Sequence, residues 1–289
     1  MSNIKIQFKQ KTKLIEEVEK LENIETIKDP SFFKSIFSSK VYPDIYFHSG
    51  NVDDSSLDTV VNSKLTIVNS YSSLQAIKHQ LKMTEANIEV IFPSFTKDDS
   101  FTKETKKIFR EKHGIKKGEK VIFFTAKNLK SSGIKNFIDI VNQIENEKIK
   151  IMIEGESKQI FNLKFQITKY DFQDRLILLE DYPNKDELFY VSDIFILPTE
   201  NRAFSTNVLK AMYYKNAVFV SATNQATEVI DVFARIESMQ DRSLFFKLDA
   251  LLANKDELKK IKKDNKNIAL EYTLEKNLEK FKALLLDLN

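Results

Sequence analysis

The stretch "LPTENRAFSTNVLKAM" (residues 197–212) is the part of the sequence that most directly indicates the fold. An apolar run ends at Pro198, a polar loop follows, and a helix is expected to begin near Ser205. A strand that leads through a loop into a helix N-terminus is where α/β proteins bind anionic ligands. The stretch therefore predicts an anion site, with Arg202 and Lys210 among its charged side chains.

The composition is that of a folded globular protein of one large or two ordinary domains. The 289 residues are 42% hydrophobic and include 23 Phe, which is ample for packed cores. The 45 basic and 42 acidic residues are mixed along the chain, so no nucleic-acid partner is expected. Without cysteine, and with three scattered histidines, the chain is expected to bind no metal and to need no cofactor.

Two further absences in the sequence narrow the class of protein. No apolar run reaches the roughly 18 residues that cross a bilayer, and no charged-then-apolar leader opens the chain, so a cytoplasmic protein is expected. Only five glycines occur, and the Gly-rich loops of dinucleotide-binding proteins and P-loop ATPases are absent. This argues against most nicotinamide enzymes and against P-loop ATPases.

Short β-branched or aromatic runs alternate with amphipathic stretches, which is typical of a doubly wound α/β protein. Thr12 and Ser70 are expected to cap two of the helices of the first half. The first half is expected to contain strands at 4–8, 24–28, 43–48, 64–70 and 88–93, and helices at 12–23, 30–39 and 70–84.

The second half is more regular, and its apolar strands are those of a buried parallel sheet. Strands are expected at 120–126, 148–155, 175–181, 193–199 and 216–222, and helices at 133–146, 157–169, 184–192, 205–215 and 224–233. From 241 onward only helices are expected. The predicted division is an N-terminal domain over 1–95, a linker with one short helix over 96–119, and a C-terminal domain with terminal helices over 120–289.

Three quoted segments of the second half resemble a known family. They are "VIFFTAKNLKSSGIKNFIDIV" (121–141), "IKIMIEGES" (149–157) and "DELFYVSDIFILPTENRAFSTNVLKAMYYKNAVFVSA" (186–222). Together they resemble the nucleotide-sugar domain of GT-B glycosyltransferases of the retaining family-4 type, and the resemblance extends over about residues 88–285. It implies an α/β, GT-B-like fold in which two Rossmann-like domains with doubly wound parallel sheets face a cleft, here with a reduced first domain.

The resemblance implies a diphosphate site in the first loop of the second domain. Lys127 stands at the position of the family's Arg, and Ser132 stands at that of its Lys, ahead of Gly133. Lys130 is nearby and could supply the lost charge, or it could belong to a solvated lysine cluster. Gly155 matches the first glycine of the family's next turn, so Gly133 and Gly155 are expected to border the donor.

Within residues 197–212 the resemblance implies two charge reversals. The family's sugar glutamate and ribose glutamate fall on Arg202 and Lys210, and a lysine has no hydrogen-bond acceptor for a ribose. Glu200 could substitute for a glutamate, or it could pair with Arg202. The remaining expected donor-binding residues are Phe204, which the family shares, and the helix N-terminus at Ser205, Thr206 and Asn207.

The first half resembles the family more weakly. "YPDIYFHSG" (42–50) is similar to a family strand, which would place His48 on the acceptor side, although a lone His is also compatible with a structural role. The family's N-terminal Gly-rich turn has no counterpart in "QFKQKTK" (7–13). "FFKSIFSSK" (32–40) is expected in a core face, or alternatively at the inner face of a membrane.

Two functions remain open. The first is a retaining glycosyltransferase that moves a sugar from a nucleotide-diphosphate sugar to a glycan, lipid-linked or protein acceptor in surface polysaccharide or glycoconjugate synthesis. Its catalytic residues would be Lys127, Lys130 and Arg202, and the reversed charges would suit a donor with an extra anionic group. The second is a non-catalytic member of the family that serves as a partner or binding subunit of another glycosyltransferase.

Overall fold

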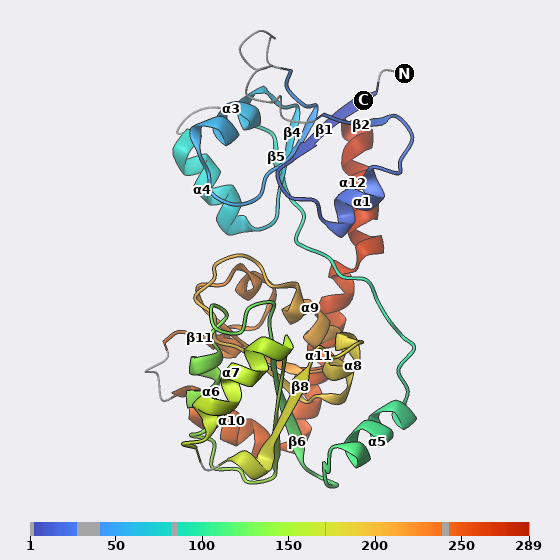
Figure 1. The fold of residues 1–289 in the computed structure, drawn as a ribbon. Coiled ribbons are helices and arrows are strands. Elements are labelled where there is room, and N and C mark those ends of the chain that lie inside the picture. Colours follow the sequence, from blue (N-terminus) through green and yellow to red (C-terminus); the bar gives the residue numbers. More distant parts are fainter. Residues whose placement is uncertain (1–2, 28–40, 82–85, 171, 239–242, 289) are drawn as a thin grey trace. The chain divides into compact units, whose positions relative to one another are not determined.

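A computed structural model of the chain describes residues 3–27, 41–81, 86–170, 172–238 and 243–288. The chain forms two compact units, each built on a parallel sheet with helices on both faces (Figure 1). The first unit contains residues 1–96 and 272–289, and the second contains residues 97–271. The expected class, an α/β protein with two Rossmann-like domains, is confirmed.

The sheet of the first unit has five parallel strands in the order β2-β1-β3-β4-β5. The central β3 and β4 are buried along their whole length, as apolar runs covered on both faces should be. The strands are β1 Ile4–Phe8, β2 Ile24–Thr26, β3 Ile45–Phe47, β4 Leu65–Val68 and β5 Ile88–Val90.

Two pairs of helices cover this sheet. α1 (Lys13–Val18) and α12 (Leu274–Asp287) lie on one face, and α3 (Asp54–Asn62) and α4 (Tyr71–Leu81) lie on the other (Figure 1). The expected caps are present, because Thr12 accepts a hydrogen bond from the Ile15 N–H and Ser70 accepts one from the Ser73 N–H.

Helix α12 belongs to the first unit, although the sequence placed it in the C-terminal domain. Its Phe281 is fully buried in the cluster that contains Ile6 and Phe47. Backbone hydrogen bonds between Phe95 and the residues on either side of Thr273 hold the start of the helix beside the end of the first segment. Periodicity shows which face of a helix is apolar, but not which sheet that face covers.

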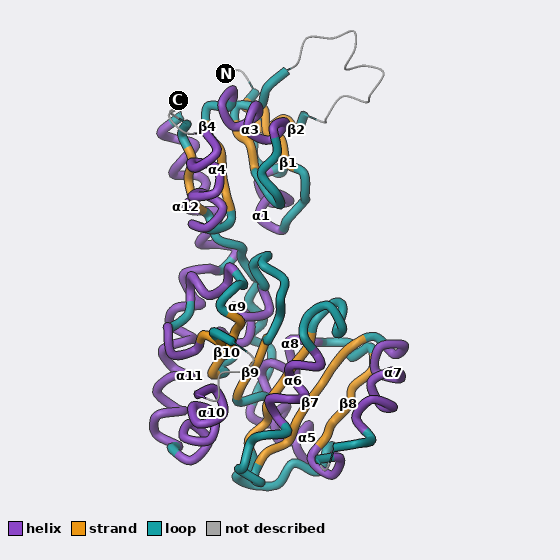
Figure 2. The backbone as a smooth tube through the Cα atoms, turned by 90° about the vertical axis from the view of Figure 1, so that its left-hand side faces the viewer, coloured by secondary structure: helices purple, strands orange, loops and turns teal. Residues whose placement is uncertain are grey.

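The sheet of the second unit has six parallel strands in the order β11-β10-β9-β6-β7-β8, and Figure 2 shows β7 and β8 side by side in it. The strands are β6 Lys120–Thr125, β7 Ile149–Gly155, β8 Leu176–Glu180, β9 Ile194–Leu197, β10 Ala217–Ser221 and β11 Arg235–Ile236. The expected strands match these closely, apart from β11, which the sequence did not predict.

Helices cover both faces of this sheet as well, with α6 and α7 on one face and α8, α9 and α11 on the other (Figure 1). The segment expected to be a linker, 96–119, contains α5 and belongs to the second unit. The helices are α5 Lys103–Lys112, α6 Ile134–Val141, α7 Ser157–Ile167, α8 Lys185–Val191, α9 Thr206–Tyr213, α10 Ser243–Ala253 and α11 Lys255–Ala269, with short 3₁₀ turns η1 Gln173–Arg175 and η4 Leu270–Tyr272.

The expected helix over 224–233 is wrong. Two 3₁₀ turns, η2 (Gln225–Val229) and η3 (Val232–Ala234), occupy the segment. The side chains of Asn224 and Asp231 each accept a hydrogen bond from the backbone N–H two residues ahead, so each residue starts a separate turn.

One helix is additional to those expected. Helix α3 was not expected, although Asp53 and Ser56 form a reciprocal capping box at its start. The expected helix over 30–39 and the membrane-contact segment 32–40 lie outside the described residues.

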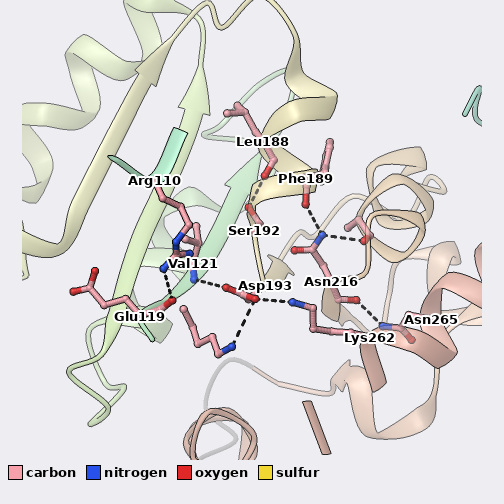
Figure 3. A network of polar contacts seen from close by, with 12 residues as sticks. Arg110, Glu119, Val121, Leu188, Phe189, Ser192, Asp193, Asn216, Lys262 and Asn265 are labelled. Atoms are coloured by element: carbon pink, nitrogen blue, oxygen red, sulfur yellow. Dashed lines mark hydrogen bonds and ion pairs between the residues drawn. The ribbon is translucent and has the colours of Figure 1, made fainter. Parts of the chain in front are cut away.

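A buried carboxylate network joins the amino ends of β6 and β9 (Figure 3). Asp193 is 5% exposed, accepts a hydrogen bond from the Val121 N–H, and lies 2.6 Å from the Lys262 ammonium on α11. Burial opposes ionisation, but Lys262 and Lys106 outweigh it and lower the pKa of Asp193 to about 2. The network thus fixes α11 against the sheet at the end opposite to the site described next.

Candidate functional site

A cavity of about 470 Å³ lies in the second unit at the carboxyl ends of β6 and β9. These two strands are neighbours, and the chain leaves them toward opposite edges of the sheet. Loops diverge at such a switch point, which is where open α/β sheets bind ligands. Its polar lining consists of Thr125, Lys127, Ser132, Glu156, Lys185, Asp186, Thr199, Asn201, Ser205, Thr206, Asn207, Lys210 and Asn224.

The loop after β6 carries Lys127, and a glutamine on α7 fixes its backbone. The Gln159 side-chain oxygen accepts a 2.6 Å hydrogen bond from the Leu129 N–H, and its amide nitrogen donates to the Lys127 carbonyl at 3.1 Å. Gly155 lies beneath the loop, where a Cβ would be 2.8 Å from the Leu129 side chain. Lys127 is exposed, and no ion pair involves it within the described part of the chain. The loop therefore presents an available ammonium to the cavity.

Gly133 brings this loop against the loop after β9. Its φ of 93° lies in the left-handed region, and a Cβ there would be 2.0 Å from the Pro198 carbonyl oxygen. Asn136, in the first turn of α6, donates a hydrogen bond to the same oxygen at 3.3 Å. Both the positive φ and the close approach of the Pro198 carbonyl require a glycine here. Without a side chain at this position, the two loops can lie against each other and border one cavity.

The loop after β9 is held by Asn224, at the end of β10. Its amide nitrogen donates 2.8 Å hydrogen bonds to the Asn201 and Ala203 carbonyls. Helix α9 then begins at Ser205, whose side chain makes no capping hydrogen bond. The first N–H groups of a helix have no partner within it, so the residues after Ser205 offer donors and the positive end of a dipole to the cavity.

Two ion pairs border the cavity on the side of α8. Lys210 on α9 lies 2.7 Å from the Asp186 carboxylate, and the two side chains are 30% and 17% exposed. Beside them the Lys185 ammonium lies 2.9 Å from Glu154, which is fully buried and also accepts a 2.6 Å hydrogen bond from the Thr125 hydroxyl. Both lysines therefore reach the cavity with a carboxylate partner.

The structure brings six of the eleven predicted catalytic and donor-binding residues into the cavity lining and leaves five outside it. Gly133 and Gly155 support the lining from below. Lys130, Glu200 and Arg202 are exposed and do not line the cavity, and no ion pair joins Glu200 to Arg202 in the described part of the chain. The predicted residues in the lining are Lys127, Phe204, Ser205, Thr206, Asn207 and Lys210.

Sequence reasoning missed Lys185 and Asp186, which line the cavity from α8. Their only sequence signal was an Asn184 cap after an apolar strand, and that signal predicts a helix start without showing which helices face each other. The pairing of Lys210 with Asp186 also weakens the expectation of an extra anionic group on the donor, because the lysine already has a counter-ion.

His48 lies in the other unit, at the carboxyl end of β3. Its side chain is 3% exposed, and its ring nitrogens make no hydrogen bond of good geometry with the described residues. Burial lowers the pKa of His48, and the nearby Lys9 ammonium lowers it further. The imidazole is therefore held neutral, and its acceptor-side role stays a prediction.

Two features are absent from the described residues. No helix there is both long and apolar enough to cross a membrane. Nor does that part of the chain contain three or more His, Asp or Glu side chains grouped so that they could hold a metal ion.

Comparison with solved structures identifies the class of fold. A glycosyltransferase from Rickettsia africae ESF-5 is 15% identical, with a TM-score of 0.73 over 96% of this chain and 80% of that one. Anabaena Alr3699/HepE, solved with UDP-glucose, is 13% identical, with a TM-score of 0.72 over 99% and 100% of the two chains. WaaG, a glycosyltransferase involved in lipopolysaccharide biosynthesis, is 11% identical, with a TM-score of 0.67 over 96% and 98%. These likenesses place the chain in the GT-B fold class.

Residues 105–268, more than half of the chain, match the family described as Glycosyl transferases group 1. The chain belongs to this family. No curated protein matches the sequence. The matched residues include every residue that lines the cavity. The resemblance to GT-B glycosyltransferases found in the sequence is thereby confirmed, and the chain is assigned to a family of sugar-transferring enzymes.

Proposed function

We propose that the protein is a retaining glycosyltransferase that moves a sugar from a nucleotide-diphosphate sugar to a glycan, lipid-linked or protein acceptor in surface polysaccharide or glycoconjugate synthesis. The observation that carries the proposal is the Lys127 ammonium, which has no ion-pair partner among the described residues and borders the same cavity as the N-terminus of α9. Diphosphate is the leaving group in this reaction, and a cation with backbone N–H donors is suited to it.

In the proposed reaction, the bond between the anomeric carbon and the diphosphate oxygen breaks, and the diphosphate leaves with the electron pair. An acceptor hydroxyl oxygen then bonds to the anomeric carbon on the face that the diphosphate left, and its proton passes to the departing diphosphate. Lys127 and the N–H groups of Thr206 and Asn207 stabilise the charge that develops on the leaving group. The loop backbones that carry these donors are fixed before the reaction, since Gln159 and Asn224 hold the two loops.

We propose further that the reaction needs no metal ion, because Lys127 and the N–H groups of α9 supply the positive charge for the diphosphate. Activity that is unchanged in EDTA supports this assignment, and activity that disappears with EDTA and returns with Mg²⁺ or Mn²⁺ opposes it. Lys130 and Arg202, the other two expected catalytic residues, lie outside the cavity lining and have no role in this proposal.

The first test is a thermal-shift titration of the whole chain with UDP, GDP, CMP and several nucleotide sugars. A ligand at about 100 times its dissociation constant stabilises the fold by about 2.7 kcal/mol, which is a readable shift. We expect one nucleotide to give this shift and Lys127→Ala to abolish it. Lys135→Ala is the matched control, because Lys135 is exposed on α6 and does not line the cavity.

The second test measures the chemistry. The nucleotide sugar that stabilises the fold is incubated with the protein, and release of the nucleoside diphosphate is followed with and without candidate acceptors. NMR of the product then shows whether the anomeric configuration of the donor is retained.

The second candidate function is a non-catalytic partner subunit of another glycosyltransferase. It is favoured by the pairing of Lys185 and Lys210 with carboxylates, which leaves Lys127 as the cation without a counter-ion among the described lining residues. Nucleotide binding without release of the diphosphate supports this candidate. No response to any nucleotide, from folded protein, contradicts the donor site itself.

A further inference from the structure

Asp186 is a carboxylate in the cavity with a fixed position and one oxygen to spare. Its Oδ1 lies 2.7 Å from the Lys210 ammonium. Its Oδ2 makes no side-chain hydrogen bond or ion pair with the described residues. The side chain is 17% exposed and lines the cavity beside Phe189 and Leu197, which supply an apolar wall. An ionised carboxylate next to an apolar wall is a strong acceptor for hydroxyl groups of a ligand.

The other carboxylates near the cavity are less suited to bind a ligand. Glu156 caps α7 without a side-chain hydrogen bond and is exposed at the tip of a turn. Glu154 is fully buried, and its two oxygens face Thr125 and Lys185. Among the described lining residues, Asp186 thus combines access to the cavity with a held orientation.

The charge of the Asp186–Lys210 pair also limits what it recognises. The lysine neutralises the aspartate, so the pair repels a diphosphate less than a lone carboxylate would, while Asp186 still accepts hydrogen bonds. Lys127 and the first turn of α9 border the same cavity from other sides. A ligand that contains both a phosphate and neighbouring hydroxyl groups fits this arrangement of a cation, helix N–H donors and a carboxylate around one cavity.

We infer that Asp186 binds a vicinal diol of the nucleotide sugar and that Lys210 is the positioning residue that orients the Asp186 carboxylate. The inference rests on the proposed function. The diol belongs either to the ribose or to the donor sugar, and both sources offer the same pair of O–H donors. Asp186 is then a specificity-determining residue, because it rejects ligands that lack one of the two hydroxyls.

The test combines changes of the ligand with changes of the residue, and calorimetry on the whole chain measures the binding affinity of each combination. Wild type and Asp186→Asn are titrated with the best-binding nucleoside diphosphate among UDP, GDP and CDP, with its 2′-deoxy counterpart, and with inorganic pyrophosphate. If the diol is that of ribose, wild type prefers the ribonucleotide by about tenfold or more, and Asp186→Asn loses this preference. Pyrophosphate binds both proteins equally, which shows that the variant is folded with an intact phosphate site.

If the diol is that of the donor sugar, the ribose and deoxyribose ligands bind alike. The loss in Asp186→Asn then appears with the intact nucleotide sugar, and it is absent for the nucleoside diphosphate. Glu187→Gln is the matched control, because the neighbouring residue loses the same charge from the same helix, bonds Tyr182 and does not line the cavity. Lys210→Met retains the carboxylate without its partner and is expected to show an intermediate preference.

The outcomes separate the two proposals. If no nucleotide or nucleotide sugar binds to folded wild type, the proposed function fails, and the inference fails with it. If nucleotides bind but Asp186→Asn matches wild type for every ligand, including the nucleotide sugar, the inference alone is wrong. An equal loss for pyrophosphate and for nucleotide also overturns it, because Asp186 would then act on the phosphate site.

Discussion

The two ends of the second unit's sheet contain the same kinds of charged residue in different surroundings. At the amino ends of β6 and β9, Asp193 is 5% exposed and has Lys262 and a backbone N–H as partners (Figure 3). At the carboxyl ends, Asp186 and Lys210 form a pair of similar length but line a cavity. Burial, rather than residue type, indicates which pair stabilises the fold and which is available to a ligand.

The largest expected effect tests the buried end. Asp193→Asn leaves the largely buried Lys262 without its counter-ion, and we expect the free energy of unfolding to fall by about 3 to 5 kcal/mol. Denaturant unfolding measures it, with Asp186→Asn as the matched variant, for which a partly exposed pair predicts less than about 1 kcal/mol. Equal losses of unfolding free energy in the two variants would contradict the distinction between a stabilising pair at the amino ends of the strands and an available pair at their carboxyl ends.

Gly133→Ala tests whether the cavity depends on close contact between its two loops. Positive φ and a Cβ 2.0 Å from the Pro198 carbonyl oxygen make any side chain unfavourable, and we expect a loss of about 3 kcal/mol in stability, measured by denaturant unfolding. Gly118→Ala is the control, since Gly118 has the same φ of 93° but no atom within 4 Å of the position that a Cβ would take. A loss no larger than that in Gly118→Ala would show that the two loops can move apart.

Gln159→Ala sharpens the comparison at the cavity end, because Gln159 acts on ligand binding through the Lys127 loop. We expect nucleoside diphosphate binding, measured by calorimetry, to weaken by about fivefold to tenfold through the loss of two hydrogen bonds that fix the loop. Gln166→Ala, an exposed position on the same helix, is expected to bind as wild type does. The double variant with Lys127→Ala should bind no worse than Lys127→Ala alone, and additive losses would contradict a positioning role.

The smallest expected effect extends the comparison to the first unit, where His48 is buried at a carboxyl end. Its lowered pKa means that the unfolded chain binds the proton more readily, so stability falls as the pH drops below about 6.5, the ordinary His pKa. His48→Gln should flatten the dependence of the melting temperature on pH in this range, whereas His79→Gln, an exposed position, should not. An unchanged pH dependence in His48→Gln would mean that the imidazole binds a proton as readily in the folded protein as in the unfolded chain.

The sequence by itself determined the parallel sheets and the site loops. Apolar runs such as 120–126 and 193–199 are continuous because both faces of a parallel strand are covered, so the strands could be predicted from their composition. The strand-loop-helix stretch after β9 likewise predicted the helix N-terminus that borders the cavity. Local signals of this kind act within a few residues and can be read directly.

Only the tertiary structure decided which charges meet. In the sequence Lys210 is a reversed charge, and its partner Asp186 comes from 24 residues earlier on another helix. The family pattern predicts Arg202 in the site, but its side chain is exposed and lies outside the cavity lining in the loop that Asn224 holds. The tertiary structure likewise decided that α12 packs on the sheet of the first unit. Long-range pairing depends on how helices pack on the sheet, and spacing along the chain does not encode that packing.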